Sequence, residues 1–204
     1  MPAPPVLSAV TPLRLAMLTG SVREGRFGPT VTRWFAEQAR EYGAFDVDVI
    51  DIADYPLPLV MPGWGGATDA ATARHHQELG GRLARADAFV VVTPEYNHSF
   101  PAALKNAVDW YRQEWEAKPV GLVSYGGQGG GIRAAEHLRQ VFAEMHALTV
   151  RDALSFPNAW DIFGDDGRPR DAEAASTAAK GMLDQLDWWA EALAEARVKR
   201  PYGA

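Results

Sequence analysis

The sequence predicts an α/β fold in which one parallel sheet of five strands is covered by helices on both faces. The first reason is that five short apolar runs alternate along the chain with segments of helical spacing, a pattern typical of βαβ units. The second is that three of these runs end in loops rich in glycine, proline or asparagine. The third is the composition, 47% apolar and 23% charged over 204 residues, which is typical of one globular core.

The first strand is expected over Leu13–Thr19, a compact apolar run that stops at a glycine. A helix should follow over residues 29–42, where apolar residues recur at helical spacing and Gly43 can end the helix. Residues 45–50 predict the second strand. We expect a single domain over residues 13–204, preceded by a flexible arm over residues 1–12 that carries four prolines and no charge.

Residues 55–68 predict a long irregular loop, because their prolines and closely spaced glycines exclude a helix or a central strand. Loops of this length are often functional, so the aromatic residues in and near it are candidates for a lid over a ligand or for a dimer contact, with core packing as the alternative. These candidates are Tyr55, Trp64, Phe100 and Trp110. Asp69 is expected to cap a helix that runs to about residue 85.

Residues 86–93 hold the strongest strand signal and are placed at the centre of the sheet. A helix should begin near Pro101 with Ser99 as its cap, and it should carry one apolar stripe that extends to Trp115. For Trp115, packing or a dimer contact is the favoured interpretation. The remaining elements are expected to be strands over 119–124 and 148–156 and helices over 132–146 and 173–196. Five such units fit a flavodoxin-like three-layer sandwich.

Composition excludes several classes of function. The net charge of −6 and the lack of a basic block argue against nucleic acid as a partner. The chain has no cysteine, which excludes disulfides, thiolate metal sites and cysteine nucleophiles, and its five histidines show no ligand spacing, so no metal is predicted. No run approaches the roughly 20 apolar residues of a membrane helix, and residues 1–12 do not resemble a signal peptide. We therefore expect a cytoplasmic protein without a membrane partner.

Three loops that directly follow predicted strands are the candidate ligand site. The first loop, residues 20–26, offers the Ser21 hydroxyl, the guanidinium groups of Arg23 and Arg26, and free backbone N–H groups before a helix, which together suit a phosphate. A tight turn with two solvated arginines is the alternative. In an open parallel sheet such loops meet at one edge.

The second loop, residues 93–98, combines a rigid proline, an aromatic ring and an amide, and could position a flat heterocycle. The third loop, residues 124–131, has five glycines in the six residues from Gly126, enough for a close approach of backbone to ligand. An ordinary turn and a flexible surface turn are the respective alternatives. The coincidence of all three loops favours a shared ligand.

The motifs GSVREGR, TPEYNHSFPAALKNAVDW and SYGGQGG together resemble the NADPH-dependent FMN reductase family, over roughly residues 13–158. The resemblance implies a flavodoxin-like fold and homodimers or dimer-based homotetramers. It also implies an FMN phosphate site at Ser21, Arg23 and Arg26. The ribityl chain and isoalloxazine would lie at Pro94, Glu95, Tyr96 and Asn97, and the ring would be flanked by Ser124, Tyr125, Gly126 and Gly127.

By the same resemblance the chain is an oxidoreductase that passes hydride from NADPH or NADH through FMN to a small acceptor such as a quinone, an azo compound, a metal oxyanion or free flavin. The chemistry would belong to the flavin, so no catalytic side chain is assigned, although His98 is a candidate neighbour of the ring. Three alternatives stay open: a flavodoxin-like electron carrier, a flavin-binding redox sensor, and a reductase that supplies reduced FMN to a monooxygenase.

Overall fold

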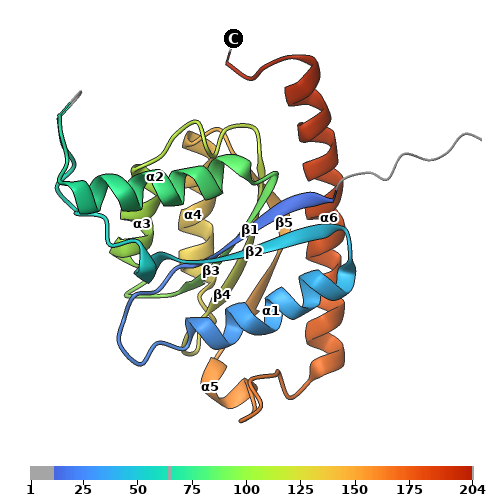
Figure 1. Ribbon diagram of the computed structural model, residues 1–204. Helices are drawn as coiled ribbons and strands as arrows, with labels where there is room; N and C mark the ends of the chain where they lie inside the picture. Colours follow the sequence, from blue (N-terminus) through green and yellow to red (C-terminus); the bar gives the residue numbers. More distant parts are fainter. Residues whose placement is uncertain (1–11, 64–65, 204) are drawn as a thin grey trace, which may run out of the picture.

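The computed structural model describes residues 12–63 and 66–203, and it shows a five-stranded parallel sheet with helices on both faces (Figure 1). The strands are β1 (Leu13–Thr19), β2 (Phe45–Asp51), β3 (Ala88–Pro94), β4 (Pro119–Tyr125) and β5 (Leu148–Phe156). The helices are α1 (Gly28–Tyr42), the 3-10 turn η1 (Ile52–Asp54), α2 (Ala70–Arg85), α3 (Ala102–Asp109), α4 (Ile132–Glu144), α5 (Ala159–Ile162) and α6 (Ala172–Lys199). The predicted fold class is confirmed.

The strand order is β2-β1-β3-β4-β5, so the chain first moves outward from β1 to β2 and then returns to build the rest of the sheet on the other side of β1. The topological switch point therefore lies between β1 and β3. This order is that of the flavodoxin-like fold, in which ligands bind beyond the carboxyl ends of the strands at the switch point.

Two hydrophobic cores lie on the two faces of the sheet. Leu15 and Met17 of β1 point towards α1 and α6, whereas the alternate residues Ala16 and Leu18 point towards α2, α3 and α4. Every residue of β3 and β4 is buried, as expected for central strands covered on both faces. The apolar runs that predicted these strands are continuous rather than alternating for the same reason.

Most predicted boundaries agree with the structure. The bounds of β1 and β5 are those predicted, and α1 ends at Tyr42 with Gly43 as its cap, whose φ of 86° is the left-handed conformation that glycine adopts readily. Asp69 caps α2 as expected, because its carboxylate accepts hydrogen bonds from the backbone N–H groups of Ala71 and Thr72. Residues 1–11, which hold nearly all of the expected arm, lie outside the described residues.

The prediction for α3 is wrong at both ends. Ser99 does not cap the helix. Instead its backbone exchanges two hydrogen bonds with Tyr96, and Pro101 occupies the cap position. The helix stops at Asp109, yet Trp115 is fully buried and its indole N–H donates to the Val108 carbonyl. An apolar residue can be buried without lying in a continuous helix. The apolar spacing that extends to Trp115 therefore predicted a longer helix than the structure has. The short elements η1 and α5 are too brief to produce a periodic signal.

The carboxyl end of α2 is closed by a buried lysine. Lys118, the residue before β4, is only 6% exposed, and its Nζ donates to the carbonyl oxygens of Leu83 and Ala84 at 3.0 Å each. A positive charge at the carboxyl end of a helix is favoured by the helix dipole.

Among the described helices none is long and apolar enough to cross a membrane.

Candidate functional site

The three predicted loops meet at the carboxyl edge of the sheet. The N–H of Gly20, at the start of the first loop, donates to the Val92 carbonyl of β3 at 2.8 Å. The Ser21 hydroxyl lies 3.0 Å from the Tyr96 hydroxyl, which joins the first loop to the second. The Glu95 N–H donates to the Tyr125 carbonyl at 3.2 Å, which joins the second loop to the third. The three loops follow β1, β3 and β4, which are neighbours in the sheet, and the contacts above place the loops side by side.

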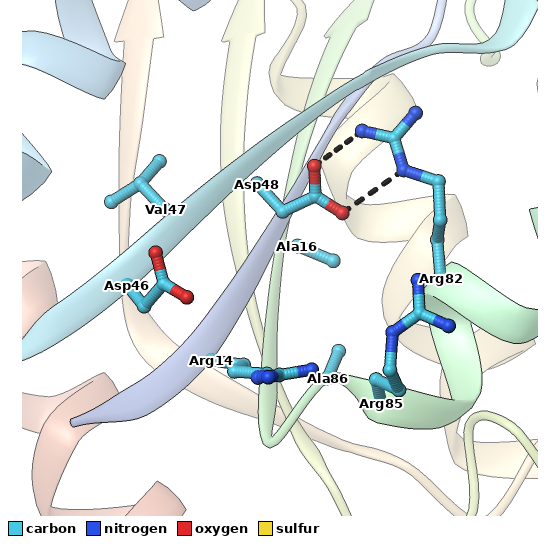
Figure 2. Close-up of a pocket in the computed structure, with 8 residues that line it drawn as sticks. All are labelled: Arg14, Ala16, Asp46, Val47, Asp48, Arg82, Arg85 and Ala86. Atoms are coloured by element: carbon cyan, nitrogen blue, oxygen red, sulfur yellow. Dashed lines mark hydrogen bonds and ion pairs between the residues drawn. The ribbon is translucent and has the colours of Figure 1, made fainter. Parts of the chain in front are cut away.

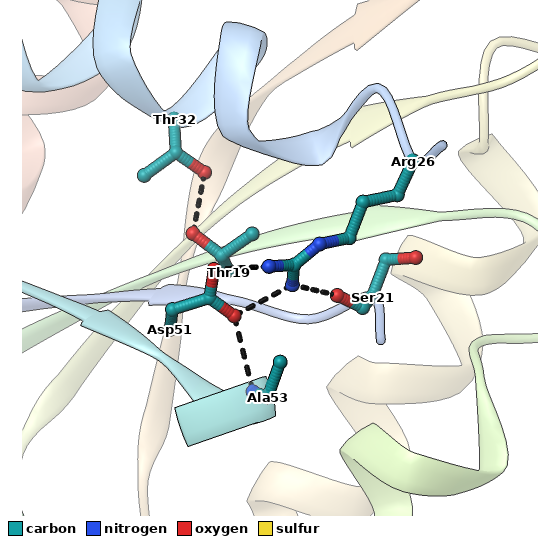
Figure 3. A network of polar contacts seen from close by, with 6 residues as sticks. All are labelled: Thr19, Ser21, Arg26, Thr32, Asp51 and Ala53. Carbon is teal, nitrogen blue, oxygen red and sulfur yellow. Dashed lines mark hydrogen bonds and ion pairs between the residues drawn. The ribbon is translucent and has the colours of Figure 1, made fainter. Parts of the chain in front are cut away.

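Arg26 ties the first loop to the neighbouring strand (Figure 3). Its guanidinium binds the Asp51 carboxylate at the end of β2 through two hydrogen bonds, of 2.6 and 2.5 Å, and also donates to the Ser21 carbonyl. Hydrogen bonding to Asp51 raises the pKa of the Arg26 guanidinium. The Asp51 carboxylate also accepts from the Ala53 N–H at 3.0 Å. Arg26 thus holds the backbone of the loop rather than pointing freely into it.

We expect this ion pair to stabilise the protein measurably. A double-mutant cycle with Arg26→Gln and Asp51→Asn should give a coupling free energy of about 1–2 kcal/mol, because the pair is bidentate and its side chains are 20% and 24% exposed. Asparagine retains an oxygen for the Ala53 N–H, so the cycle measures the loss of charge. Chemical unfolding gives the four stabilities needed.

The matched control for that cycle is the pair of Arg168 and Glu37, whose side chains are 60% and 38% exposed. Solvent screening should hold its coupling to within a few tenths of a kcal/mol. Equal coupling energies for the two pairs would show that Arg26 and Asp51 have no special structural role.

The start of α1 offers polar groups to the same edge. Arg23 is exposed, whereas Ser21 is 1% exposed. Within the described chain α1 receives no side-chain cap, because Phe27 occupies the cap position. Pro29 in the first turn has no N–H, and the Thr30 N–H donates to the Phe27 carbonyl at 3.0 Å, so this helix start offers an anion chiefly the positive end of the helix dipole.

Glu95 in the second loop holds the third loop and α4. Its carboxylate accepts from the Arg133 backbone N–H at 3.2 Å and pairs with the Arg133 guanidinium. Since Gly131 has no side chain with which to cap α4, the carboxylate of Glu95 takes that role. Asn97 and His98 are exposed and have φ values of 50° and 71°, the left-handed conformation that non-glycine residues rarely adopt.

The side chains that open the third loop face the protein interior. The Ser124 hydroxyl donates to the Gly130 carbonyl at 2.9 Å, and a Cβ atom placed on Gly28 would lie 2.8 Å from the Tyr125 hydroxyl. Burial raises the pKa of Tyr125 above the ordinary value for a phenol. Gly127 is exposed, and an added Cβ there would meet Trp160 at 3.9 Å as its nearest neighbour. The loop therefore offers glycine backbone at its surface.

The aromatic candidates for a lid have different surroundings. Tyr55 packs against His75 and its hydroxyl accepts a hydrogen bond from Arg82, while the Trp110 indole donates to the Pro58 carbonyl at 3.1 Å. Phe100 packs on the core between the sheet and α3. Trp64 lies outside the described residues.

An apolar cavity of about 380 Å³ lies beside the first loop. The residues that line it come from the first loop, from η1 and the segment that follows, and from α3; they include Val22, Ile52, Tyr55, Leu57 and Ala103. Asn106 helps to form this wall by donating to the Leu57 carbonyl at 2.8 Å.

A second, charged cavity of about 280 Å³ lies away from the predicted site, between α2 and the first residues of β1 and β2 (Figure 2). Arg82 and Asp48 form an ion pair across it, and Arg14 and Arg85 line its other side. None of the residues that the sequence assigns to the ligand site lines this cavity.

Sequence reasoning missed three residues that shape the site: Asp51, Arg133 and Trp160. Asp51 and Arg133 are ordinary surface charges in the sequence, and only strand pairing and loop packing bring them to Arg26 and Glu95. Trp160 lies in the four-residue helix α5, where it is 59% exposed. A tryptophan shortly after a predicted strand was the one available signal in the sequence.

Comparison with known protein families matches residues 13–161 to the model described as NADPH-dependent FMN reductase. An NAD(P)H-dependent FMN reductase of Schizosaccharomyces pombe is 39% identical over 163 residues, which cover 77% of this chain and 80% of that protein. The NADPH:quinone oxidoreductase of Arabidopsis thaliana is 34% identical, with coverages of 78% and 85%, and the quinone reductase of Escherichia coli K12 is 34% identical, with coverages of 68% and 73%.

Among solved structures, the flavoenzyme NAD(P)H:(acceptor) oxidoreductase of Paracoccus denitrificans is similar to this chain with a TM-score of 0.63 and 24% identity, over 88% of this chain and 97% of that one. A structure of RosB with a bound riboflavin-phosphate intermediate gives a TM-score of 0.70 at 14% identity, over 94% of this chain and 82% of that one. At these identities the similarity concerns the fold.

Proposed function

This chain belongs to the NADPH-dependent FMN reductase family, and on that basis we propose that the three loops at the carboxyl edge of its sheet bind FMN and that the protein uses NAD(P)H to reduce a small acceptor. The observation that carries the proposal is the junction of the three loops, through Ser21 and Tyr96 and through Glu95 and Tyr125, at the switch point of the sheet. Bound FMN supplies the ring that accepts and donates hydride.

The residues at this edge fit the chemistry of FMN. The uncapped start of α1, the buried Ser21 hydroxyl and the exposed Arg23 suit the phosphate. The Tyr96 ring and the exposed glycine backbone at Gly127 suit a flat heterocycle that must approach the main chain closely. We assign Arg26 to positioning the phosphate loop through Asp51, and Glu95 to positioning the third loop through Arg133.

The roles proposed for the other predicted residues are secondary. Pro94 and Asn97 set the course of the second loop beside the ring, and Gly126 provides backbone there. Ser124 and Tyr125 support the third loop from the protein interior, because their hydroxyl groups are turned into the protein. His98 is exposed next to Asn97 and remains a candidate ring neighbour with no assigned proton transfer.

The role of Arg23 can be tested directly. Arg23→Gln should weaken FMN binding roughly tenfold, because it removes a charge-assisted hydrogen bond worth about 1.5 kcal/mol at an exposed position. Fluorescence titration of the protein with FMN measures the affinity. Arg33→Gln, which alters an exposed arginine of α1, is the matched control. An unchanged affinity in Arg23→Gln would remove Arg23 from the phosphate site.

The activity is tested by a visible spectrum recorded before and after anaerobic addition of NADPH. We expect a yellow protein that bleaches promptly and regains its colour when an acceptor is added. A protein that stays yellow would be an electron carrier or a sensor. Rapid release of reduced FMN would favour a supplier of reduced flavin to a monooxygenase, and a protein that takes up no FMN would overturn the site.

We propose a quinone as the preferred acceptor. The Arabidopsis and Escherichia coli relatives are both named for quinone reduction, and the apolar cavity beside Val22 offers a surface for the apolar part of such a molecule. Steady-state rates with benzoquinone, an azo dye, chromate and free FMN at matched concentrations test this preference. A higher kcat/KM for any of the other three acceptors would contradict it.

A further inference from the structure

We propose that the opposite edge of the sheet carries a second binding site, which takes a small amphipathic anion: a carboxylate with an apolar chain. The site is a cavity of about 760 Å³, here named the amino-edge pocket. It lies where the ends of α4 and α6 meet the start of β5 and the segment 200–203. In Figure 1 this end of α6 lies at the top of the view, whereas α5 and the loop after β1 lie at the bottom.

The wall of the amino-edge pocket is largely apolar, and its small side chains leave room for a cavity between the helix ends. Four alanines contribute to it, and Leu148 and Leu193 complete the apolar part. The alanines are Ala117, Ala143, Ala147 and Ala196. Ligand sites combine an apolar wall of this kind with a few polar groups that orient the ligand. This wall is suited to a hydrocarbon chain.

The ionised side chains of the pocket have one sign. Arg197 and Arg200 line it together with the imidazole of His146, and none of its lining residues is acidic within the described chain. Arg197 already donates to Asp87 at 2.9 Å and to the Ala117 carbonyl at 2.7 Å. The exposed Arg200 is therefore the group that we assign to the ligand's carboxylate, with His146 beside it. This positive rim stands out on a chain whose net charge is −6.

The backbone of the pocket is strained. Within the described residues, five non-glycine residues have a positive φ, and three of them, Asn97, His98 and Asn158, lie at the cofactor edge. The other two, Ala117 and His146, both line the amino-edge pocket, and the Ala117 N–H donates to the His146 carbonyl at 2.9 Å. His146 follows the cap residue at the end of α4, where a left-handed residue is a common helix ending and the Ala147 N–H donates to the Phe142 carbonyl, so the strain lies in Ala117. A left-handed alanine is unfavourable, and such residues concentrate at functional sites. The two edges of the sheet share this feature.

One wall of the pocket is formed by the chain after α6. The Tyr202 hydroxyl lies 3.0 Å from Nδ1 of His146, and the two rings meet edge to face with centroids 5.7 Å apart. Pro201 and Tyr202 line the cavity from this side. This side of the pocket is thus closed by the contact between Tyr202 and His146, whose imidazole lines the pocket together with the two arginines.

The test uses the full chain loaded with FMN and measures binding of decanoate by isothermal titration calorimetry. We expect one decanoate per chain and no release of FMN. Ala143→Leu should weaken binding at least tenfold, because Ala143 is exposed on the pocket side of α4 and a larger side chain there fills the apolar space. Arg200→Gln should weaken it three- to tenfold, and it alters an exposed side chain.

The controls are Ala178→Leu and Arg40→Gln, which make the same changes at exposed positions of α6 and α1 and should leave the affinity unchanged. Decanol should bind at least tenfold more weakly than decanoate. The proposal is overturned if decanoate gives no binding heat, if it displaces FMN, if decanol binds equally well, or if neither Ala143→Leu nor Arg200→Gln weakens binding more than its control. None of these outcomes depends on turnover, so the result is separate from that of the NADPH test.

Discussion

Replacing Gly131 with alanine is expected to lower the free energy of unfolding by roughly 3 kcal/mol and to abolish the yellow colour of the FMN-loaded protein. Gly131 has a φ of 85°, and an added Cβ would lie 2.7 Å from Cβ of Ser124 and 2.8 Å from the Tyr125 backbone nitrogen. Because the backbone at the end of β4 cannot move without disturbing the central sheet, the third loop must shift instead. Thermal unfolding and the visible spectrum measure the two effects.

Gly25→Ala is the matched control for this experiment. Gly25 also has a positive φ, of 65°, but an added Cβ would meet nothing within 4 Å. Its cost should therefore be only the conformational one, about 1 kcal/mol. Gly127→Ala adds a methyl group without a positive φ or a close contact and should be nearly neutral for stability. Equal losses for Gly131→Ala and Gly25→Ala would refute the close-contact argument.

The second large effect is a dependence of stability on pH that comes from Lys118. Burial, helped by the nearby charge of Arg197 and opposed by that of Asp87, lowers the pKa of Lys118 from 10.5 to about 8. Between these two values the unfolded chain keeps the proton that the folded chain has lost, so the free energy of unfolding rises with pH. The rise should total about 3 kcal/mol from pH 8 to pH 10.5, and below pH 8 this contribution should be constant.

Comparison with Lys118→Met isolates that contribution, because other groups titrate in the same range in both proteins. The difference in unfolding free energy between wild type and Lys118→Met should shift in favour of wild type as the pH rises from 8 to 10.5. Lys105→Met, which changes a lysine with a side chain 43% exposed, should keep the profile of the wild type. A constant difference between wild type and Lys118→Met would show that Lys118 does not lose its proton in this range.

The architecture was predictable because each strand is an apolar run that ends in a distinctive loop. The interior strands are buried on both faces, so each can be recognised from its own apolar run without knowing which strands pair with it. The bounds predicted for β1 and β5 agree with the structure. The end of α3 was not predictable in the same way. Trp115 keeps the apolar spacing of a helix but is buried from a turn, where its indole satisfies the Val108 carbonyl. The spacing of apolar residues indicates which side chains are buried. At Trp115 the side chain is buried although the helix has already ended.

The candidate site divides along a similar line. The types of group at the carboxyl edge, a hydroxyl, guanidinium groups, an aromatic ring and glycines, can be read from the three loops. Which of them face a ligand cannot, because that depends on partners distant in the sequence. Arg26 faces Asp51, 25 positions away, and Glu95 faces Arg133, 38 positions away. The two predicted binding residues therefore act, in our proposal, by holding the loops in place.

By itself the sequence determined the order of strands and helices, the family and the three loops, because these depend on local spacing and on short contiguous motifs. Only the tertiary structure decided which strands are neighbours, how Asp51 and Arg133 hold the first and second loops, and where Ala117 and His146, two left-handed residues, meet at the far edge. The reason is physical. Periodicity arises from contacts a few residues apart, whereas ion pairs, caps and cavities arise between segments that the chain brings together only when the sheet is complete.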